Sequence, residues 1–222
     1  MSDVDEVMTI LKKKIKNYIN PVVTEVAEET SDLFKVLISC LLSLRTRDPI
    51  TEKVSRVLFE KYDTPEKIDS MDIKELKKII RPVNYYITKA KRIKEICNVL
   101  LDKYDGKVPD NMEELLKLKG VGRKTASIVM IYGYDSKDYI CVDTHVNRLP
   151  NRIGWVKTKN PHQTELALMK IVPKKYWADL NNTFVAFGQN ICRPINPKCW
   201  ECPITKYCAY YKENYLCERR KV

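Results

Sequence analysis

Apolar residues recur at helical spacing along almost the whole chain. An N-terminal stripe is formed by Val4, Met8, Leu11, Ile15 and Ile19. Later stripes contain Leu76, Ile79 and Ile80, and then Ile93, Ile96, Val99 and Leu100. This spacing predicts one apolar face on each of several α-helices. No segment alternates apolar and polar residues for long enough to predict a β-sheet, so the pattern predicts an all-α protein.

Residues that start helices divide the pattern into separate elements. Ser31 precedes a segment, residues 32–44, that is apolar nearly all round. We expect Ser31 to cap this helix and the helix to lie at the centre of a core, because it has almost no polar face. Asp48 followed by Pro49 predicts the start of the next helix, and Asp72 predicts another start.

Two short helical segments in the middle of the chain flank a turn that contains glycine. The first is carried by Met112, Leu115, Leu116 and Leu118, and the second runs over residues 123–131. Gly120 and Gly122, on either side of Val121, allow backbone angles that other residues resist. We expect the amides of Val121, Gly122 and Arg123 to be open at a helix N-terminus, where the dipole favours a phosphate. An ordinary tight turn between helices would equally account for both glycines.

Lys124 follows this turn directly, in the first turn of the second helix. The positive end of the helix dipole and the adjacent Arg123 both oppose the ammonium form of Lys124. Both effects favour the neutral amine, which is the form that attacks an electrophilic carbon. A phosphate contact or simple solvation is the alternative in a chain that has 40 Lys and Arg residues.

Asp143 precedes a further apolar stretch and is predicted to cap a helix there. A carboxylate held at a helix start can also face a cleft, so capping is compatible with a catalytic role. His145 is one of 2 histidines in the chain. We interpret it as support for the local fold.

Four cysteines near the C-terminus, Cys192, Cys199, Cys202 and Cys208, are spaced C-x6-C-x2-C-x5-C. Clustered cysteines are typical of a disulfide network or of a metal centre. With 8 cysteines in 222 residues, the chain is no disulfide-dense scaffold, and we expect no secretory signal at its start. The spacing therefore predicts a tetrathiolate metal site. It favours iron–sulfur over zinc, because zinc sites usually have two short C-x2-C pairs.

The remaining cysteines have no assigned role. Cys40, Cys97 and Cys141 lie in apolar segments and are predicted to be buried like small hydrophobic residues. Cys217 lies near a basic tail and is interpreted as a surplus thiol.

The chain is strongly basic, with 40 Lys and Arg against 29 Asp and Glu and a formal charge of +11. Such an excess favours a polyanionic partner, with nucleic acid ahead of a membrane surface. A lysine-rich solvated surface is the alternative. No apolar run approaches the roughly 20 residues of a membrane span, so we expect no membrane among its partners.

Taken together, these segments resemble the endonuclease III family of base-excision DNA glycosylases, within the helix–hairpin–helix superfamily. The resemblance is carried by residues 118–126, by residues 142–146 and by the four-cysteine run. It implies a two-lobed fold with a C-terminal [4Fe–4S] cluster loop.

The lobes implied by this resemblance are a six-helix barrel with the hairpin and an iron–sulfur domain. The barrel is expected over residues 26–137, and the iron–sulfur domain over residues 1–25 and 138–222. The active site is expected in the cleft between them.

The resemblance also implies a role for each motif. Lys124 matches the nucleophile that attacks C1′ of the damaged nucleotide, expels the base and forms a Schiff base, after which β-elimination cuts the strand. Asp143 matches the essential carboxylate, and the four cysteines match the cluster ligands. Contacts with DNA are expected from Gly120, Val121, Gly122 and Arg123 and, between the first two cluster ligands, from Arg193 and Lys198.

Three positions depart from the family pattern. Lys119 stands where proline is usual in the hairpin. Arg45 stands where a glutamine commonly fills the vacated base stack, and Tyr85 lies near a second wedge that is often leucine. Arginine can also stack and pair with the orphaned base, but its preferred partner differs from that of glutamine.

We therefore expect a bifunctional glycosylase and abasic-site lyase with oxidised pyrimidines as its substrates. It would act as a monomer on duplex DNA, inside the cell in the cytoplasm or nucleoid. Removal of mismatched thymine or uracil, or of oxidised purines, is the alternative within the superfamily. A non-catalytic, metal-stabilised DNA-binding protein would also account for the hairpin and the cysteines. An iron–sulfur redox carrier would account for the cysteines but would leave Lys124 and Asp143 unexplained.

Overall fold

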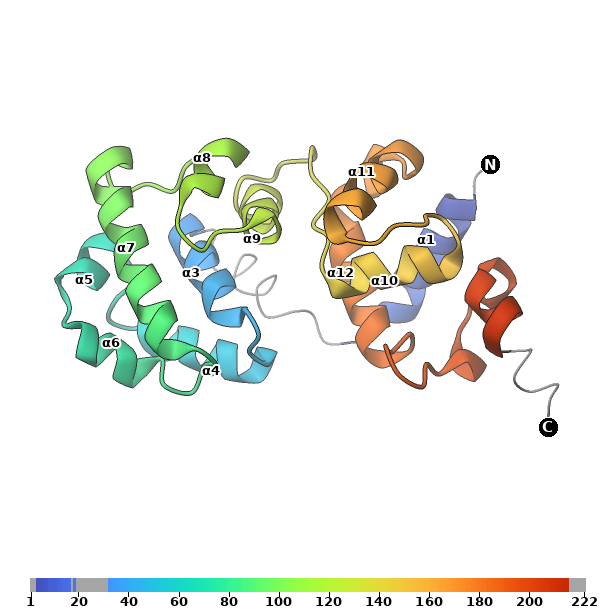
Figure 1. Cartoon of the computed structure of the whole chain (residues 1–222), viewed down its shortest axis with the longest axis horizontal. Coiled ribbons are helices and arrows are strands. Elements are labelled where there is room, and N and C mark those ends of the chain that lie inside the picture. Colours follow the sequence, from blue (N-terminus) through green and yellow to red (C-terminus); the bar gives the residue numbers. More distant parts are fainter. Residues whose placement is uncertain (1–2, 17, 19–31, 216–222) are drawn as a thin grey trace. The chain divides into compact units, whose positions relative to one another are not determined.

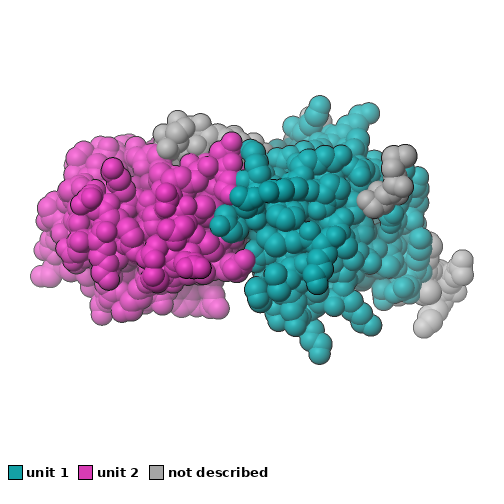
Figure 2. All heavy atoms as spheres, turned by 90° about the horizontal axis from the view of Figure 1, so that it is seen from above, with its two compact units in different colours: residues 1–20, 137–222 teal, residues 21–136 magenta. Residues whose placement is uncertain are grey.

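The computed structural model describes residues 3–16, 18 and 32–215, and the regular elements in these ranges are helical (Figure 1). These residues contain no β-strand, so the all-α prediction is confirmed. The chain divides into two compact units (Figure 2). Unit 1 comprises residues 1–20 and 137–222, and unit 2 comprises residues 21–136.

Each unit is a set of short and medium helices. Unit 2 contains α3 (Leu33–Ser43), α4 (Asp48–Phe59), α5 (Pro65–Ser70), α6 (Ile73–Ile79), α7 (Tyr86–Tyr104), α8 (Met112–Lys117), α9 (Arg123–Ile128) and a π-helical turn, η1 (Val129–Gly133). Unit 1 contains α1 (Asp3–Ile15), α10 (Thr144–Ile153), α11 (Pro161–Ile171) and α12 (Trp177–Asn190). Shorter turns in unit 1 are η2 (Lys174–Tyr176), η3 (Cys199–Glu201), η4 (Thr205–Tyr207) and η5 (Tyr211–Tyr215).

α3 is the central helix of unit 2, as its nearly continuous apolar sequence predicts. It packs against α4, α7, α9 and η1. Its cap, however, is Asp32, whose Oδ1 accepts hydrogen bonds from Phe34 N (2.9 Å) and Lys35 N (3.2 Å). The predicted cap, Ser31, lies outside the described residues. Asp32 is the cap because its carboxylate reaches two of the amides that a helix start leaves without partners.

Other predicted helix starts agree with the structure, and one predicted helix differs in its second half. α4 begins at Asp48, and Asp72 caps α6 by accepting from Lys74 N at 2.8 Å. The helix predicted over residues 123–131 is α-helical only to Ile128. It then widens into η1, where Tyr134 N donates to Val129 O at 3.1 Å across five residues.

One lysine lies inside unit 2. Lys89 of α7 is 6% exposed. Its Nζ donates to the carbonyl oxygens of Leu42 and Leu44, each at 2.7 Å, and to Thr46 Oγ1 at 3.1 Å. Burial lowers the pKa of Lys89 to about 8. The partners of the Lys89 ammonium are therefore neutral oxygens at the C-terminal end of α3, where the helix dipole favours a cation.

Unit 1 is built around α12, which packs against α10 and α1. Leu180, Phe184 and Phe187 of α12 are buried in its core, together with Met8 and Leu11 of α1. α1 therefore belongs to the same core as the C-terminal part of the chain. Ile19, the last member of the N-terminal stripe, lies outside the described residues. None of the described helices combines the length and the apolar composition needed to cross a lipid bilayer.

Candidate functional site

The two glycines of the turn between α8 and α9 have different roles. Gly120 has φ +94°, and a Cβ added there would lie 2.8 Å from Cδ of Arg92. Gly122 has φ −96°, and a Cβ added there would meet nothing within 4 Å. The fold therefore requires glycine at position 120 but not at position 122, where the space beside the backbone is open.

Of the three amides predicted to be open at this turn, Val121 N is used internally. It donates to Leu118 O at 2.9 Å and closes the turn, while the Val121 side chain is buried. The prediction of an open amide is therefore wrong for Val121, because this residue holds the turn together. Gly122 N donates to no atom of the described residues, and Gly122 O accepts the first bond of α9, from Ala126 N at 2.9 Å.

Lys124 lies in the first turn of α9 with an exposed side chain, whereas the following Thr125 and Ala126 are buried. Its charge acts on the thiol of Cys40 in α3. Burial raises the pKa of Cys40 to about 12, and the nearby positive charge of Lys124 opposes that rise. The Lys124 amine is thus accessible to solvent and close to the helix at the centre of unit 2. Cys40, Cys97 and Cys141 are buried, as predicted.

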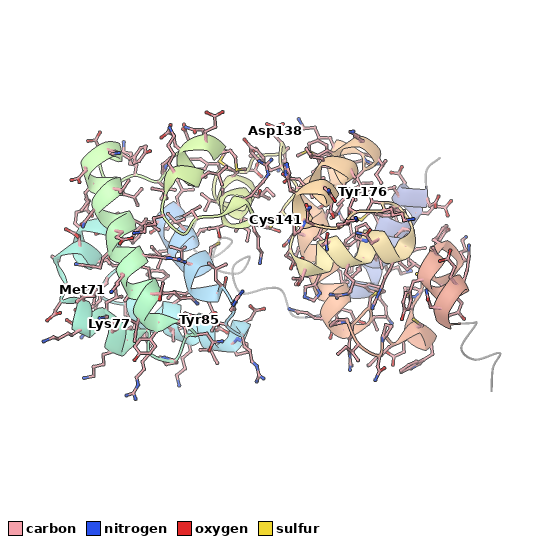
Figure 3. All side chains as sticks on the ribbon, viewed as in Figure 1. Met71, Lys77, Tyr85, Asp138, Cys141 and Tyr176 are labelled. Atoms are coloured by element: carbon pink, nitrogen blue, oxygen red, sulfur yellow. The ribbon has the colours of Figure 1, made fainter. Side chains whose placement is uncertain are left out.

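Arg45, after the C-terminus of α3, and Tyr85, before α7, form an exposed pair in unit 2. The guanidinium carbon of Arg45 lies 5.8 Å from the centroid of the Tyr85 ring, and Arg45 Nη1 donates to the Tyr85 hydroxyl at 3.5 Å. Tyr85 is 62% exposed at the start of α7 (Figure 3). Together with Lys89 and Arg92 they line a pocket. The structure thus brings the two predicted wedge residues together.

Asp143 caps α10 in unit 1, as predicted. Its Oδ1 accepts hydrogen bonds from His145 N and Val146 N, each at 2.8 Å. These two bonds fix the orientation of the carboxylate at the start of the helix. His145 Nδ1 lies 3.0 Å from Arg148 Nη2, which agrees with a role in the local fold.

The four C-terminal cysteines, Cys192, Cys199, Cys202 and Cys208, line a single hollow in unit 1. No disulfide links the cysteines of the described ranges. Burial raises the pKa of Cys199, and the charges of Cys192 and Cys208 raise it further. Burial also raises the pKa of Cys202 to about 12. A metal centre would have to offset this cost, because thiolates are the metal-binding form.

The arrangement of these thiols fits a cluster better than a single ion. A zinc site holds each thiolate sulfur at about 2.3 Å from one metal. Within the described part of the chain, no three His, Cys, Asp or Glu side chains are placed to hold a single metal ion. Four thiols that line one hollow suit an iron–sulfur cluster, which cysteine thiolates hold.

Two arginines of α10 hold the segment that begins at the first cysteine, although no sequence motif singled them out. Arg148 Nη2 donates to Cys192 O at 2.9 Å. Arg152 donates to Arg193 O at 2.6 Å, to Pro194 O at 2.8 Å and to Cys192 Sγ at 3.5 Å. The one feature of the sequence that could have identified these two arginines is their spacing of four residues, which places them on the same face of a helix.

The two basic residues predicted to contact DNA in this segment differ in their surroundings. Arg193 is exposed. Lys198 is half-buried, and its Nζ lies 3.5 Å from Glu201 Oε1. Arg193 is therefore the more accessible of the two cations.

Comparison with known proteins places these features in one family. A family model described as "HhH-GPD superfamily base excision DNA repair protein" matches residues 38–174. A second, "Iron-sulfur binding domain of endonuclease III", matches residues 192–208, which contain all four clustered cysteines. Endonuclease III of Thermotoga maritima is 50% identical over 182 residues, covering 82% of this chain and 85% of that protein. The chain belongs to the endonuclease III family.

Further relatives and solved structures agree. Endonuclease III homolog 1, chloroplastic, of Arabidopsis thaliana is 39% identical over 83% of this chain, which spans 51% of that longer protein. A non-covalent endonuclease III–DNA complex matches with a TM-score of 0.84 and 32% identity, covering 100% of both chains. A trapped endonuclease III–DNA covalent intermediate matches with a TM-score of 0.80 and 32% identity, covering 97% of this chain and 100% of that one.

This endonuclease III family member is thus a DNA glycosylase of base excision repair that binds DNA. It carries a [4Fe–4S] cluster. The fold class, enzyme class and cofactor predicted from the sequence are confirmed.

Replacing each hairpin glycine by alanine is expected to affect stability at one position and DNA binding at the other. Gly120→Ala should lower the free energy of unfolding by about 1–2 kcal/mol, because alanine resists the left-handed backbone. Gly122→Ala should change that free energy by less than about 0.5 kcal/mol. It should nevertheless weaken duplex DNA binding, because its methyl group would occupy the open space beside the amide. Urea unfolding and fluorescence anisotropy measure the two effects. Equal destabilisation by both variants, or normal DNA affinity of Gly122→Ala, would contradict this division.

Cys202→Ala is expected to remove the cluster and to destabilise unit 1, since metal binding there is coupled to folding. The wild-type protein, purified without oxygen, should absorb broadly near about 400 nm, as thiolate-bound iron does. The variant should lose this band and melt at a lower temperature. Cys97→Ala, a change at a buried cysteine of unit 2, is the control and should keep the band. A colourless wild-type protein with stoichiometric zinc would refute the cluster assignment.

Proposed function

We propose that this protein is a bifunctional glycosylase, which removes a damaged base from duplex DNA and then cuts the strand at the abasic site. The observation that carries this proposal is the position of Lys124. Its exposed amine lies two residues after Gly122, whose amide is open at the tip of the hairpin. A phosphate held at that amide would bring the sugar-phosphate backbone within reach of the nucleophile.

Lys124 would act as the nucleophile in its neutral form. Its nitrogen forms a bond to C1′ of the damaged nucleotide while the bond between C1′ and the base breaks and the base leaves. The nitrogen then loses one proton, and its lone pair forms a protonated imine with C1′ as the bond between C1′ and the ring oxygen breaks and that oxygen takes up a proton. Removal of a proton from C2′ breaks the bond between C3′ and its oxygen and cuts the strand. Because the lysine displaces the base directly, no activated water is required.

Asp143 would supply the carboxylate for the same reaction. The two hydrogen bonds to Oδ1 fix this group, so Oδ2 is the oxygen that we assign to the positive charge developing at C1′. Lys124 belongs to unit 2 and Asp143 to unit 1. The proposal therefore requires that both units bind the same nucleotide.

The damaged base has to leave the helix before the sugar can be reached, at a cost of a few kcal/mol in lost stacking and pairing. We assign the filling of the resulting gap to Arg45 and Tyr85, whose exposed aromatic ring and guanidinium can stack on bases. Phosphate contacts are assigned to the hairpin and to Arg193, and the cluster ligands to the four clustered cysteines. One chain supplies all these groups, so a monomer bound to genomic DNA suffices.

Oxidised pyrimidines are the substrates that we propose, since endonuclease III proteins are the relatives matched over most of the chain. Removal of mismatched thymine is the second candidate. A thermostable thymine-DNA glycosylase matches with a TM-score of 0.80 and 27% identity, covering 95% of this chain and 99% of that one. Duplexes containing thymine glycol, a G·T mismatch or a G·U mismatch distinguish the candidates by their single-turnover excision rates.

Lys124→Ala is expected to abolish covalent trapping. With borohydride and a duplex that has one abasic site, the wild-type protein should form a covalent adduct visible on a denaturing gel. The variant should form none, because the Schiff base requires the Lys124 amine. Lys117→Ala, which removes an exposed lysine of α8, is the matched control and should trap normally. An undiminished adduct with Lys124→Ala would place the nucleophile elsewhere.

Asp143→Asn and Asp143→Ala are expected to separate capping from catalysis. Asparagine keeps an oxygen at the cap, so Asp143→Asn should retain stability and DNA affinity while base release falls by about a hundredfold or more. Asp143→Ala should lose about 1 kcal/mol of stability in addition. Thermal melting and single-turnover excision measure the two effects. Near-normal base release by Asp143→Asn would restrict this residue to its capping role.

A further inference from the structure

Lys89 is the only buried lysine or arginine in the described part of the chain. No carboxylate of the described residues lies within ion-pair distance of its Nζ, which donates to the carbonyls of Leu42 and Leu44 and to the hydroxyl of Thr46. Removing an ammonium from water without a counter-ion is costly. This cost points to a role beyond filling space in the core.

The acceptors of Lys89 belong to the end of α3 and to the strained turn that carries Arg45. Thr46 N donates to Ser43 O at 3.0 Å, and Leu44 has φ −55° and ψ 114°. Arg45 follows with φ +56°, which makes this a type II turn with arginine at the position that favours glycine. A left-handed conformation costs a residue such as arginine about 1–2 kcal/mol. The side chain of Lys89 bonds on both sides of this strained residue.

The backbone of Lys89 is bonded to the second left-handed residue of the site. Tyr85 has φ +58°, and its carbonyl accepts from Lys89 N at 3.0 Å in the first turn of α7. Asn84 connects the same two segments, since its side chain donates to Arg45 O and its amide donates to Thr46 Oγ1 at 3.2 Å. Lys89 therefore links the turn that carries Arg45 to the residue that begins α7.

We propose that Lys89 is a positioning residue that holds Arg45 and Tyr85 as one rigid wedge, through which the enzyme distinguishes the base left opposite the excised one. This inference rests on the proposed function, because it needs a flipped nucleotide and a gap. Lys89 is buried, so this role requires no contact between Lys89 and DNA. The wedge is the exposed Arg45–Tyr85 pair, whose guanidinium can stack in the gap and donate hydrogen bonds to the opposite base.

The chemistry of the site requires a lysine donor. Three N–H bonds on one tetrahedral nitrogen match three acceptors on different sides. Methionine fills a similar volume but donates nothing, so Lys89→Met leaves the Leu42 and Leu44 carbonyls without this partner. The turn is then expected to relax from its left-handed conformation, and Arg45 and Tyr85 to move independently.

Lys94 provides a matched control on the same helix. Its Nζ donates to the carbonyls of Ile68, Asp69 and Met71, at the end of α5 and just beyond it. Lys94→Met therefore removes a similar set of bonds, together with an ion pair to Asp69 Oδ1 at 3.8 Å, at a site that contacts neither Arg45 nor Tyr85.

The test uses two measurements. The first is the single-turnover excision rate of thymine glycol in duplexes where it lies opposite each of the four bases. The second is borohydride trapping on a single-stranded abasic oligonucleotide. Lys89→Met should slow excision from duplexes by about tenfold or more and reduce the differences between opposite bases. Trapping on the single strand, which has no gap to fill, should stay within about twofold of wild type. Lys94→Met should change neither measurement. If Lys89→Met behaves like Lys94→Met, or loses trapping to the same extent as excision, the positioning role is wrong.

Arg45→Gly provides a second, independent test. It removes the wedge side chain and relieves the left-handed strain, so it should reduce opposite-base discrimination as Lys89→Met does. In the double variant, Lys89→Met should cause little further loss of opposite-base discrimination beyond that of Arg45→Gly, because both changes act on the same wedge. Fully additive losses would overturn the proposal. If Lys89→Met does not fold, Thr46→Val replaces it in the test, because this change removes one acceptor of the Lys89 ammonium. Unchanged opposite-base discrimination in Thr46→Val would also overturn the proposal.

These outcomes are separable from a failure of the proposed function. A wild-type protein that neither excises a base nor forms the trapped adduct would refute the proposed function itself. An active wild-type protein with unaltered Lys89→Met kinetics would refute only the role of Lys89.

Discussion

An α-helix leaves its first amides and its last carbonyls without partners, and in this protein three such ends position the functional groups. The N-terminus of α9 exposes the Gly122 amide and carries Lys124 in its first turn. The N-terminus of α10 is closed by Asp143. The C-terminus of α3 is closed by the ammonium of Lys89. Asp143 and Lys89 each satisfy the bonding requirement of a helix end and are thereby held in a fixed orientation, whereas the start of α9 leaves the Gly122 amide open. Groups held in a fixed orientation are the condition for efficient catalysis.

The buried ammonium of Lys89 contributes close to zero to the net stability of the fold. Burying an ammonium costs several kcal/mol even after relaxation. Hydrogen bonds that involve a charged group contribute about 1.5–3 kcal/mol each, and the ammonium makes three in the structure. The two terms are of similar size, so the cation adds little net stability. Its effect is instead to fix the conformation of one turn, and the strained φ of Arg45 is the visible consequence.

Periodicity and capping chemistry predicted most of the fold, because several helices have a clear apolar face, α3 is apolar nearly all round, and several helices have an unambiguous start. The position of Asp143 before an apolar stretch identified it as a cap, and cysteine spacing identified Cys192, Cys199, Cys202 and Cys208 as one group. Long-range bonds were not predictable. Lys89 occupies a position in the apolar stripe of α7 and could have been noticed there, yet its acceptors lie more than 40 residues earlier in the chain. The bond from Val121 N to Leu118 O was missed because glycine spacing does not show which amide closes the turn.

The two units divide the proposed chemistry between them. Unit 2 holds the hairpin, the nucleophile and the wedge, whereas unit 1 holds the carboxylate and the thiols. Within unit 1, Asp143 caps α10, and Arg148 and Arg152 of this helix hold the carbonyls of residues 192–194. Because metal binding is coupled to folding, a cluster bound by the cysteines stabilises the segment to which these arginines donate hydrogen bonds. The metal centre can therefore support catalysis without touching the base, by fixing the helix whose first-turn amides orient the Asp143 carboxylate.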